Sequence, residues 1–188
     1  MDKYRNIEEN LEGYKGVIFD LDETLVDLNV DWEGLKRALS ELVMKEKGVE
    51  IIFTPLDQQI QKVKEKFGEP FFFRLLELVS QFELCEEKYE LNHELISLLE
   101  FCREKKIAIY SMNTDECVRN FVEKYLEKEP DIIISKDNCI EPKPTGKDLE
   151  KIIKEWKMSA NEVVYIGNSE NDRLCGEKAR IKTHIISF

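Results

Sequence analysis

Residues 16–24 read Gly-Val-Ile-Phe-Asp-Leu-Asp-Glu-Thr, a short apolar run that ends in two aspartates, Asp20 and Asp22. The run is largely β-branched and does not alternate with polar residues, as is typical of a strand buried on both faces of a parallel sheet. Open sheets of this kind bind ligands beyond the carboxyl ends of their strands. The stretch therefore predicts a buried strand that presents two carboxylates at the ligand-binding edge of a sheet.

Four further apolar runs have strand length, at residues 107–110, 132–134, 163–166 and 183–186. Helical spacing of apolar residues separates the later runs, so that strands alternate with helices. Thr114 and Thr145 are expected to cap two of these helices, and residues 159–162 resemble a capping box. The pattern predicts an α/β fold of Rossmann-like type, with a central parallel sheet of about five strands flanked by helices.

Residues 28–90 interrupt this alternation, because they contain helical stripes and no good strand. Apolar residues recur at helix spacing from Trp32, from Leu56 and from Phe72, and Pro55, Gly68 and Pro70 punctuate them. A segment of this length is too long for an ordinary crossover. We predict two domains: an α/β core formed by residues 1–27 and 91–188, and a small all-helical insert formed by residues 28–90.

Composition narrows the class of protein and the choice of partner. The chain has 188 residues, 42% of them apolar, and a formal net charge of −11, which disfavours nucleic acid as a partner. No stretch approaches the roughly 20 apolar residues of a membrane helix, and residues 1–9 lack an apolar signal core. We therefore expect a cytoplasmic protein with no membrane partner. The five cysteines are odd in number and lack CxxC spacing, which favours free thiols over a metal site.

Polar side chains with complementary chemistry follow four of the five predicted strands. Two neighbouring carboxylates can act as nucleophile and acid/base, a hydroxyl with adjacent backbone amides can bind phosphate, and a lysine can neutralise developing charge. Further oxygen ligands can bind Mg²⁺, which proteins share with phosphate groups. Besides Asp20 and Asp22, the set comprises Ser111 and Asn113 after the second strand, Lys143 after the third, and Asn168 and Asp172 after the fourth.

These residues resemble, in order, the four motifs of the haloacid dehalogenase-like (HAD) superfamily of phosphohydrolases. The first motif is a strand that ends in DxDxT, matched by residues 19–24, and the second is a strand that ends in Ser111. Lys143 beside proline matches the third motif, and residues 163–172 match the fourth, which is usually GDxxxD. The helical insert is similar to the cap of the phosphoglycolate phosphatase-like branch.

The resemblance implies a role for each of these residues. Asp20 would attack phosphorus, and Asp22 would serve as the general acid and base. Phosphate would be bound by Ser111, the backbone amides of Met112 and Asn113, and Lys143. A Mg²⁺ cofactor would be held by Asp20, Asp22, Asn168 and Asp172. The cap would contribute contacts to a small phosphorylated metabolite, with Arg74 as the first candidate.

One position departs from the family pattern, because Asn168 replaces the first acid of the fourth motif. An amide oxygen can bind Mg²⁺ but contributes no charge, so we expect weaker Mg²⁺ affinity; alternatively, Asn168 is a plain turn residue. The leading hypothesis is a phosphatase acting on a phosphate monoester. A phosphomutase, or a HAD-type binding or regulatory module with weakened catalysis, is the alternative. The protein is expected to be a monomer or a homodimer.

Overall fold

The five predicted apolar runs form one parallel sheet. The computed structural model describes residue 7, residues 11–85 and residues 88–188. The sheet has the order β5-β4-β1-β6-β7, and its strands span Gly16–Phe19 (β1), Lys106–Tyr110 (β4), Ile132–Ile134 (β5), Val163–Gly167 (β6) and Lys182–Ile185 (β7). All four residues of β1 are buried, as expected for a central strand. The predicted α/β class with a parallel sheet is confirmed.

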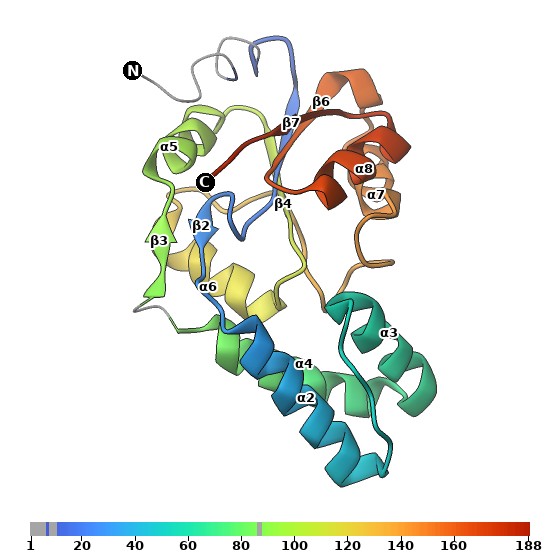
Figure 1. Ribbon diagram of the computed structural model, residues 1–188. Helices are drawn as coiled ribbons and strands as arrows, with labels where there is room; N and C mark the ends of the chain where they lie inside the picture. Colours follow the sequence, from blue (N-terminus) through green and yellow to red (C-terminus); the bar gives the residue numbers. More distant parts are fainter. Residues whose placement is uncertain (1–6, 8–10, 86–87) are drawn as a thin grey trace. The chain divides into compact units, whose positions relative to one another are not determined.

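Helices lie on both sides of this sheet (Figure 1). They span His93–Phe101 (α5), Asp115–Tyr125 (α6), Lys147–Glu155 (α7) and Glu170–Ala179 (α8). Figure 1 shows α5 and α6 on one side of the strands and α7 and α8 on the other. A buried apolar cluster joins the sheet to α7 and α8 and includes Ile18, Tyr110, Leu149, Tyr165 and Cys175.

The predicted capping residues have different outcomes. Thr114 caps α6 by accepting a hydrogen bond from the Cys117 amide, and the box at Ser159 and Glu162 is present on a short 3₁₀ helix, Ala160–Glu162. The prediction for Thr145 is wrong, because the residue before α7 is Gly146, which has a φ of 79°. The buried Oγ1 of Thr145 has no hydrogen-bond partner among the described residues.

The chain divides into two compact units, one formed by Met1–Asp27 with Tyr89–Phe188 and the other by Leu28–Lys88. The second unit contains Trp32–Lys47 (α2), Leu56–Phe67 (α3) and Glu69–Glu83 (α4), which share a buried apolar cluster. Phe72 is buried there, as its place in the stripe predicts, and Phe71 is buried with it. None of the helices in the described ranges combines the length and apolar character that crossing a bilayer requires.

A two-stranded antiparallel ribbon, which the sequence did not reveal, lies where the chain leaves and re-enters the first unit. It pairs Val26–Asp27 (β2) with Glu90–Leu91 (β3), and the Asn92 amide donates to the Leu25 carbonyl nearby. The ribbon joins the two connections to the helical unit.

Candidate active site

The register of the sheet brings the predicted site residues to one edge. Phe19, the last residue of β1, pairs with Ile109 of β4 and with Ile166 of β6. The next residue, Asp20, therefore lies beside the carboxyl ends of both neighbouring strands. Side chains that are far apart in sequence meet at this edge because all three strands end there.

Lys143 lies between two buried carboxylates. Its Nζ is 2.7 Å from Oδ1 of Asp20 and 2.7 Å from Oδ1 of Asp172. The three side chains are at most 8% exposed, and the Lys143 ammonium also lies 4.6 Å from the ring centroid of Tyr110. Although burial lowers the pKa of Lys143, the Asp20 and Asp172 carboxylates raise it above the ordinary value, so the side chain remains an ammonium.

Asp172 is fully buried in the first turn of α8, and both of its oxygens accept hydrogen bonds. Oδ1 accepts from the Tyr165 hydroxyl at 2.5 Å as well as from Lys143, and Oδ2 accepts from the amide and hydroxyl of Ser169, the N-cap of α8. Burial by itself raises the pKa of Asp172, but Lys143 and the hydrogen bonds from Ser169 and Tyr165 lower it to about 2. Asp172 is therefore a carboxylate that positions Lys143.

Asp20 carries the opposite pKa shift. Its Oδ2 accepts a hydrogen bond from Thr24 Oγ1 at 3.1 Å. Burial raises the pKa of Asp20 to about 6, the Asp172 charge acts in the same direction, and Lys143 opposes both. Two buried carboxylates thus share one ammonium, which leaves one negative charge that a further cation would balance.

The donor set at this edge fits Mg²⁺ in kind. Mg²⁺ prefers oxygen ligands and is usually bound by one or two carboxylates together with water and substrate phosphate. Asp20 supplies a carboxylate, Asp22 a backbone carbonyl and Asn168 an amide oxygen. Within the described ranges, no group of three or more Asp, Glu, His or Cys side chains is arranged to hold a metal.

Asn168 and Asp22 follow the ends of β6 and β1. The Nδ2 of Asn168 donates a hydrogen bond to Oε2 of Glu23 at 2.8 Å. Glu23 has a φ of 53°, in the left-handed region, and its amide donates to the Val26 carbonyl at 2.7 Å. Asp22 is half-buried and forms a backbone bridge with Val26. The turn after β1 thus places Glu23 against Asn168.

The predicted phosphate-binding residues follow β4. Ser111 Oγ donates to Oδ1 of Asn113 at 2.6 Å and accepts from the Asn113 amide at 3.1 Å. Both residues are buried, and the partly buried Met112 packs on the apolar cluster beneath the sheet. Met112 is therefore able to contact a phosphate only through its backbone amide, the group that the family resemblance implies.

Arg74 belongs to the helical unit, where it forms an ion pair with Glu46 of α2 at 2.7 Å and its side chain is 56% exposed. Its predicted contact with substrate stays a prediction.

Sequence reasoning missed contributions from Tyr165 and Glu23. An aromatic residue in a buried strand is typical of core, and only the fold shows that the Tyr165 hydroxyl reaches Asp172. Burial raises the pKa of Tyr165, so the hydroxyl remains a donor. Glu23 lies within the quoted run, but nothing in the run indicates its partner 145 residues away.

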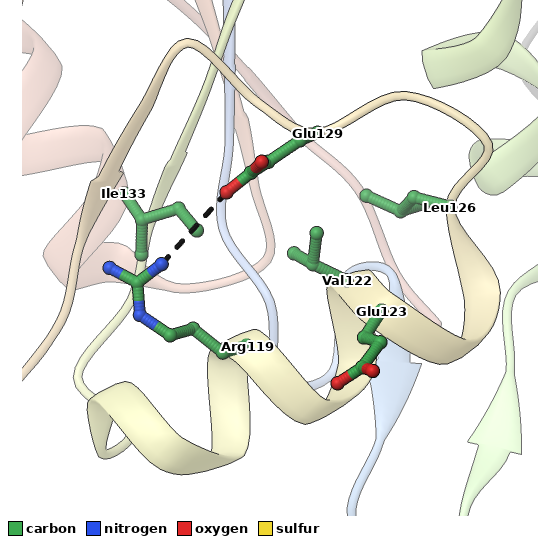
Figure 2. A pocket seen from close by; sticks show the side chains of 6 residues that line it. All are labelled: Arg119, Val122, Glu123, Leu126, Glu129 and Ile133. Atoms are coloured by element: carbon green, nitrogen blue, oxygen red, sulfur yellow. Dashed lines mark ion pairs between the residues drawn. The ribbon is translucent and has the colours of Figure 1, made fainter.

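A separate pocket of about 340 Å³ lies between α6, the loop after it and β5 (Figure 2). It is lined by Arg119, Val122, Glu123, Leu126, Glu129 and Ile133, and Figure 2 shows the Arg119–Glu129 ion pair across it. None of the predicted site residues lines it. The pocket is therefore not part of the candidate site.

Comparison with known proteins gives one family match that covers most of the chain. The family model described as haloacid dehalogenase-like hydrolase matches residues 17–186. A search of curated proteins found no significant match.

Solved structures resemble the chain in fold. CbbY from Rhodobacter sphaeroides, in complex with phosphate, is 14% identical, with a TM-score of 0.67 over 93% of this chain and 87% of that protein. A haloacid dehalogenase-like family protein of Streptococcus pneumoniae is 16% identical, with a TM-score of 0.58 over 93% and 85%. A predicted phosphoglycolate phosphatase of Haemophilus somnus is 15% identical, with a TM-score of 0.61 over 91% and 84%. At these identities the likeness concerns the fold.

Proposed function

The chain belongs to the haloacid dehalogenase-like hydrolase family, and from that premise we propose that it is a Mg²⁺-dependent phosphohydrolase that cleaves a small phosphate monoester. The observation that carries the proposal is the buried Asp20–Lys143–Asp172 group at the carboxyl edge of the sheet, with both contacts of Lys143 at 2.7 Å. A carboxylate and an ammonium fixed side by side suit attack on a phosphoryl group, because the ammonium offsets the charge that gathers on the phosphate oxygens.

In the first step, an oxygen of Asp20 forms a bond to phosphorus and the bond from phosphorus to the ester oxygen breaks. The leaving oxygen takes a proton from Asp22. In the second step, Asp22 takes a proton from water, the water oxygen attacks phosphorus, and inorganic phosphate and free Asp20 result. Thr24, which donates to Asp20 Oδ2, keeps the carboxylate oriented between turnovers.

Asp20, the backbone carbonyl of Asp22 and the amide oxygen of Asn168 would hold Mg²⁺, which when bound neutralises charge on the transferring phosphoryl group. Asp172 is a less direct ligand in this proposal, because both of its oxygens already accept hydrogen bonds from Lys143, Tyr165 and Ser169. Ser111 and the amides after it would bind the phosphate oxygens.

The substrate would be a small phosphorylated carboxylic acid of the phosphoglycolate type, and the helical unit Leu28–Lys88 would act as a cap that excludes water. The support for this substrate class comes from the names of three structural neighbours, among them the predicted phosphoglycolate phosphatase of Haemophilus somnus. The exposed Arg74 guanidinium is the residue of the helical unit that we propose for the substrate carboxylate.

A multiple-turnover assay on p-nitrophenyl phosphate with Mg²⁺ tests the proposal. The native protein should release phosphate, and Asp20→Asn should reduce the rate to background because an amide cannot form the phosphorylated intermediate. Asp131→Asn is the matched control, since Asp131 lies at the amino edge of β4, and it should keep the native rate. Turnover that survives Asp20→Asn would exclude Asp20 as nucleophile.

One observation favours a second candidate, a binding or regulatory module with weakened catalysis. Asn168 provides a neutral ligand where the family usually has an acid, so the metal site is poorer in charge. Absence of turnover in the native protein, together with measurable binding of phosphate and Mg²⁺, would support this candidate over the phosphatase.

A further inference from the structure

Glu23 lies between Asp22 and Thr24 but has no part in the proposed mechanism. Its side chain is exposed, and its Oε2 accepts the hydrogen bond that Asn168 Nδ2 donates at 2.8 Å. The two residues come from different ends of the chain, 145 positions apart. The contact therefore exists only because β1 and β6 are neighbours in the sheet.

The chemistry of the two groups determines which way the Asn168 amide faces. An ionised glutamate can only accept hydrogen bonds, whereas the asparagine amide has a donor end and an acceptor end. The NH₂ end must therefore face Glu23, and Oδ1 is directed away from it. Because Mg²⁺ binds oxygen and not an amide NH₂, this orientation decides whether Asn168 can be a ligand.

The backbone of the turn holds Glu23 in position. A left-handed φ of 53° costs a non-glycine residue about 1 kcal/mol, and the bond from the Glu23 amide to the Val26 carbonyl at 2.7 Å stabilises it. The Thr24, Leu25 and Val26 amides all donate to the Leu21 carbonyl. The Glu23 side chain is thus presented to Asn168 by a hydrogen-bonded turn.

We propose that Glu23 is a positioning residue that turns the Asn168 amide so that its oxygen is available to Mg²⁺. The inference rests on the proposed function, because it presumes that Mg²⁺ binds at this edge. It also makes Glu23 and Asn168 a matched pair: an aspartate at position 168 would have no NH to donate and would be repelled by Glu23. Removing the Glu23 carboxylate should therefore lower the Mg²⁺ affinity more with asparagine at position 168 than with aspartate there.

Isothermal titration of Mg²⁺ into the full chain, without substrate, tests this pair in four proteins: native, Glu23→Gln, Asn168→Asp and the double variant. Glu23→Gln should weaken Mg²⁺ binding by about three- to tenfold, because glutamine can also donate and no longer selects one amide orientation. Asn168→Asp by itself should tighten binding. In the Asn168→Asp background, Glu23→Gln should weaken binding by no more than about twofold, because either oxygen of an aspartate can bind Mg²⁺ and no amide has to be oriented.

Glu104→Gln is the control for loss of one negative charge, since Glu104 is 92% exposed and precedes β4 at the opposite edge of the sheet. It should leave the Mg²⁺ dissociation constant within about twofold. Urea unfolding should show that each variant is folded, and Glu23→Ala repeats the native-background test if the glutamine variant is unstable.

Equal weakening of Mg²⁺ binding by Glu23→Gln in both backgrounds would mean that Glu23 acts only through its charge, and would overturn the inference. No change in either background would overturn it as well. If the native protein binds Mg²⁺ but both backgrounds respond equally to Glu23→Gln, the inference fails and the proposed function still stands. Native protein that binds no Mg²⁺ overturns the inference and also removes the metal from the proposed function.

Discussion

Lys143 is the residue on which the electrostatics of the site depend. One ammonium lies 2.7 Å from each of two buried carboxylates, and the pKa of Asp20 is raised to about 6 even in its presence. Removing one partner of a buried ionic group leaves the others without compensation, at a cost of several kcal/mol. Loss of Lys143 should therefore affect the stability of the protein as well as the candidate catalytic chemistry.

We predict that Lys143→Met destabilises the protein by about 3–5 kcal/mol at pH 8, measured by urea unfolding in the presence of a chelator. In this variant the folded pKa of Asp20 lies further above that of the unfolded chain, and Asp172 loses the ammonium that holds its pKa down. Stability should therefore be lost as the pH rises through the folded pKa, and the deficit should shrink at pH 5. The exposed Lys147→Met is the control, and an equal deficit at both pH values would contradict the prediction.

At the scale of elements, Gly146 determines how α7 begins. Its φ is 79°, and a Cβ on it would lie 2.9 Å from the Cys175 carbonyl oxygen of α8. Gly48 at the end of α2 has a similar φ of 64° but open space around it. Substituting Gly48 tests backbone strain alone, whereas substituting Gly146 tests backbone strain together with steric conflict.

Gly146→Ala should therefore cost more than Gly48→Ala in thermal or urea unfolding. We expect about 1 kcal/mol for Gly48→Ala, from the left-handed φ alone, and about 2–3 kcal/mol for Gly146→Ala, which adds the conflict with α8. Equal losses would show that α8 moves away without cost.

Asp131 ties the starts of β4 and β5 together, because its carboxylate accepts from Lys106 Nζ at 2.5 Å and from the Ile107 amide at 2.9 Å. Burial raises the pKa of Asp131, but these hydrogen bonds hold it below its usual value. A lowered folded pKa stabilises the protein above the unfolded value near 3.9, and that stability disappears as the pH falls through the folded pKa.

Asp131→Asn should accordingly be less stable than the native protein by about 1 kcal/mol at pH 7, since the carboxylate is partly exposed and screened. The difference should narrow from about pH 4 downwards, measured by urea unfolding at each pH where both proteins fold. A difference that is independent of pH would mean that the charge of Asp131 contributes nothing.

At the scale of the whole molecule, the described parts of the candidate site all lie in the α/β unit. The helical unit is proposed to contribute a contact to the substrate. Arg74 is the residue to test, and its ion pair with Glu46 supplies the control. If only the ion pair matters, removing Arg74 or removing Glu46 should change KM equally.

If Arg74 binds the substrate carboxylate, Arg74→Ala should raise KM for phosphoglycolate by about tenfold and leave KM for p-nitrophenyl phosphate unchanged, because the latter has no carboxylate. Glu46→Gln frees the guanidinium and should not raise KM for either compound. Equal effects of the two substitutions would assign Arg74 a structural role within the helical unit.

The α/β class and the strands were predictable because buried parallel strands are continuous apolar runs, a local signal. The insert was predictable because three helical stripes replaced the expected alternation. The ribbon of Val26–Asp27 and Glu90–Leu91 was not predictable, since two residues carry no periodicity. Thr145 was misjudged because the backbone conformation before α7 is set by packing against α8, to which glycine and not a polar cap is suited.

The sequence by itself determined the chemical identity of the candidate site: each of Asp20, Ser111, Lys143 and Asp172 follows a recognisable strand, and their side-chain types already indicate phosphoryl chemistry. Tertiary structure alone decided how these groups act on one another. Strand order and register bring Asp20 and Asp172 within 2.7 Å of Lys143. They also bring the Tyr165 hydroxyl to Asp172 and the Asn168 amide to Glu23. Local patterns carry no information about which strand ends are neighbours, because that is settled by packing energy summed over the whole sheet.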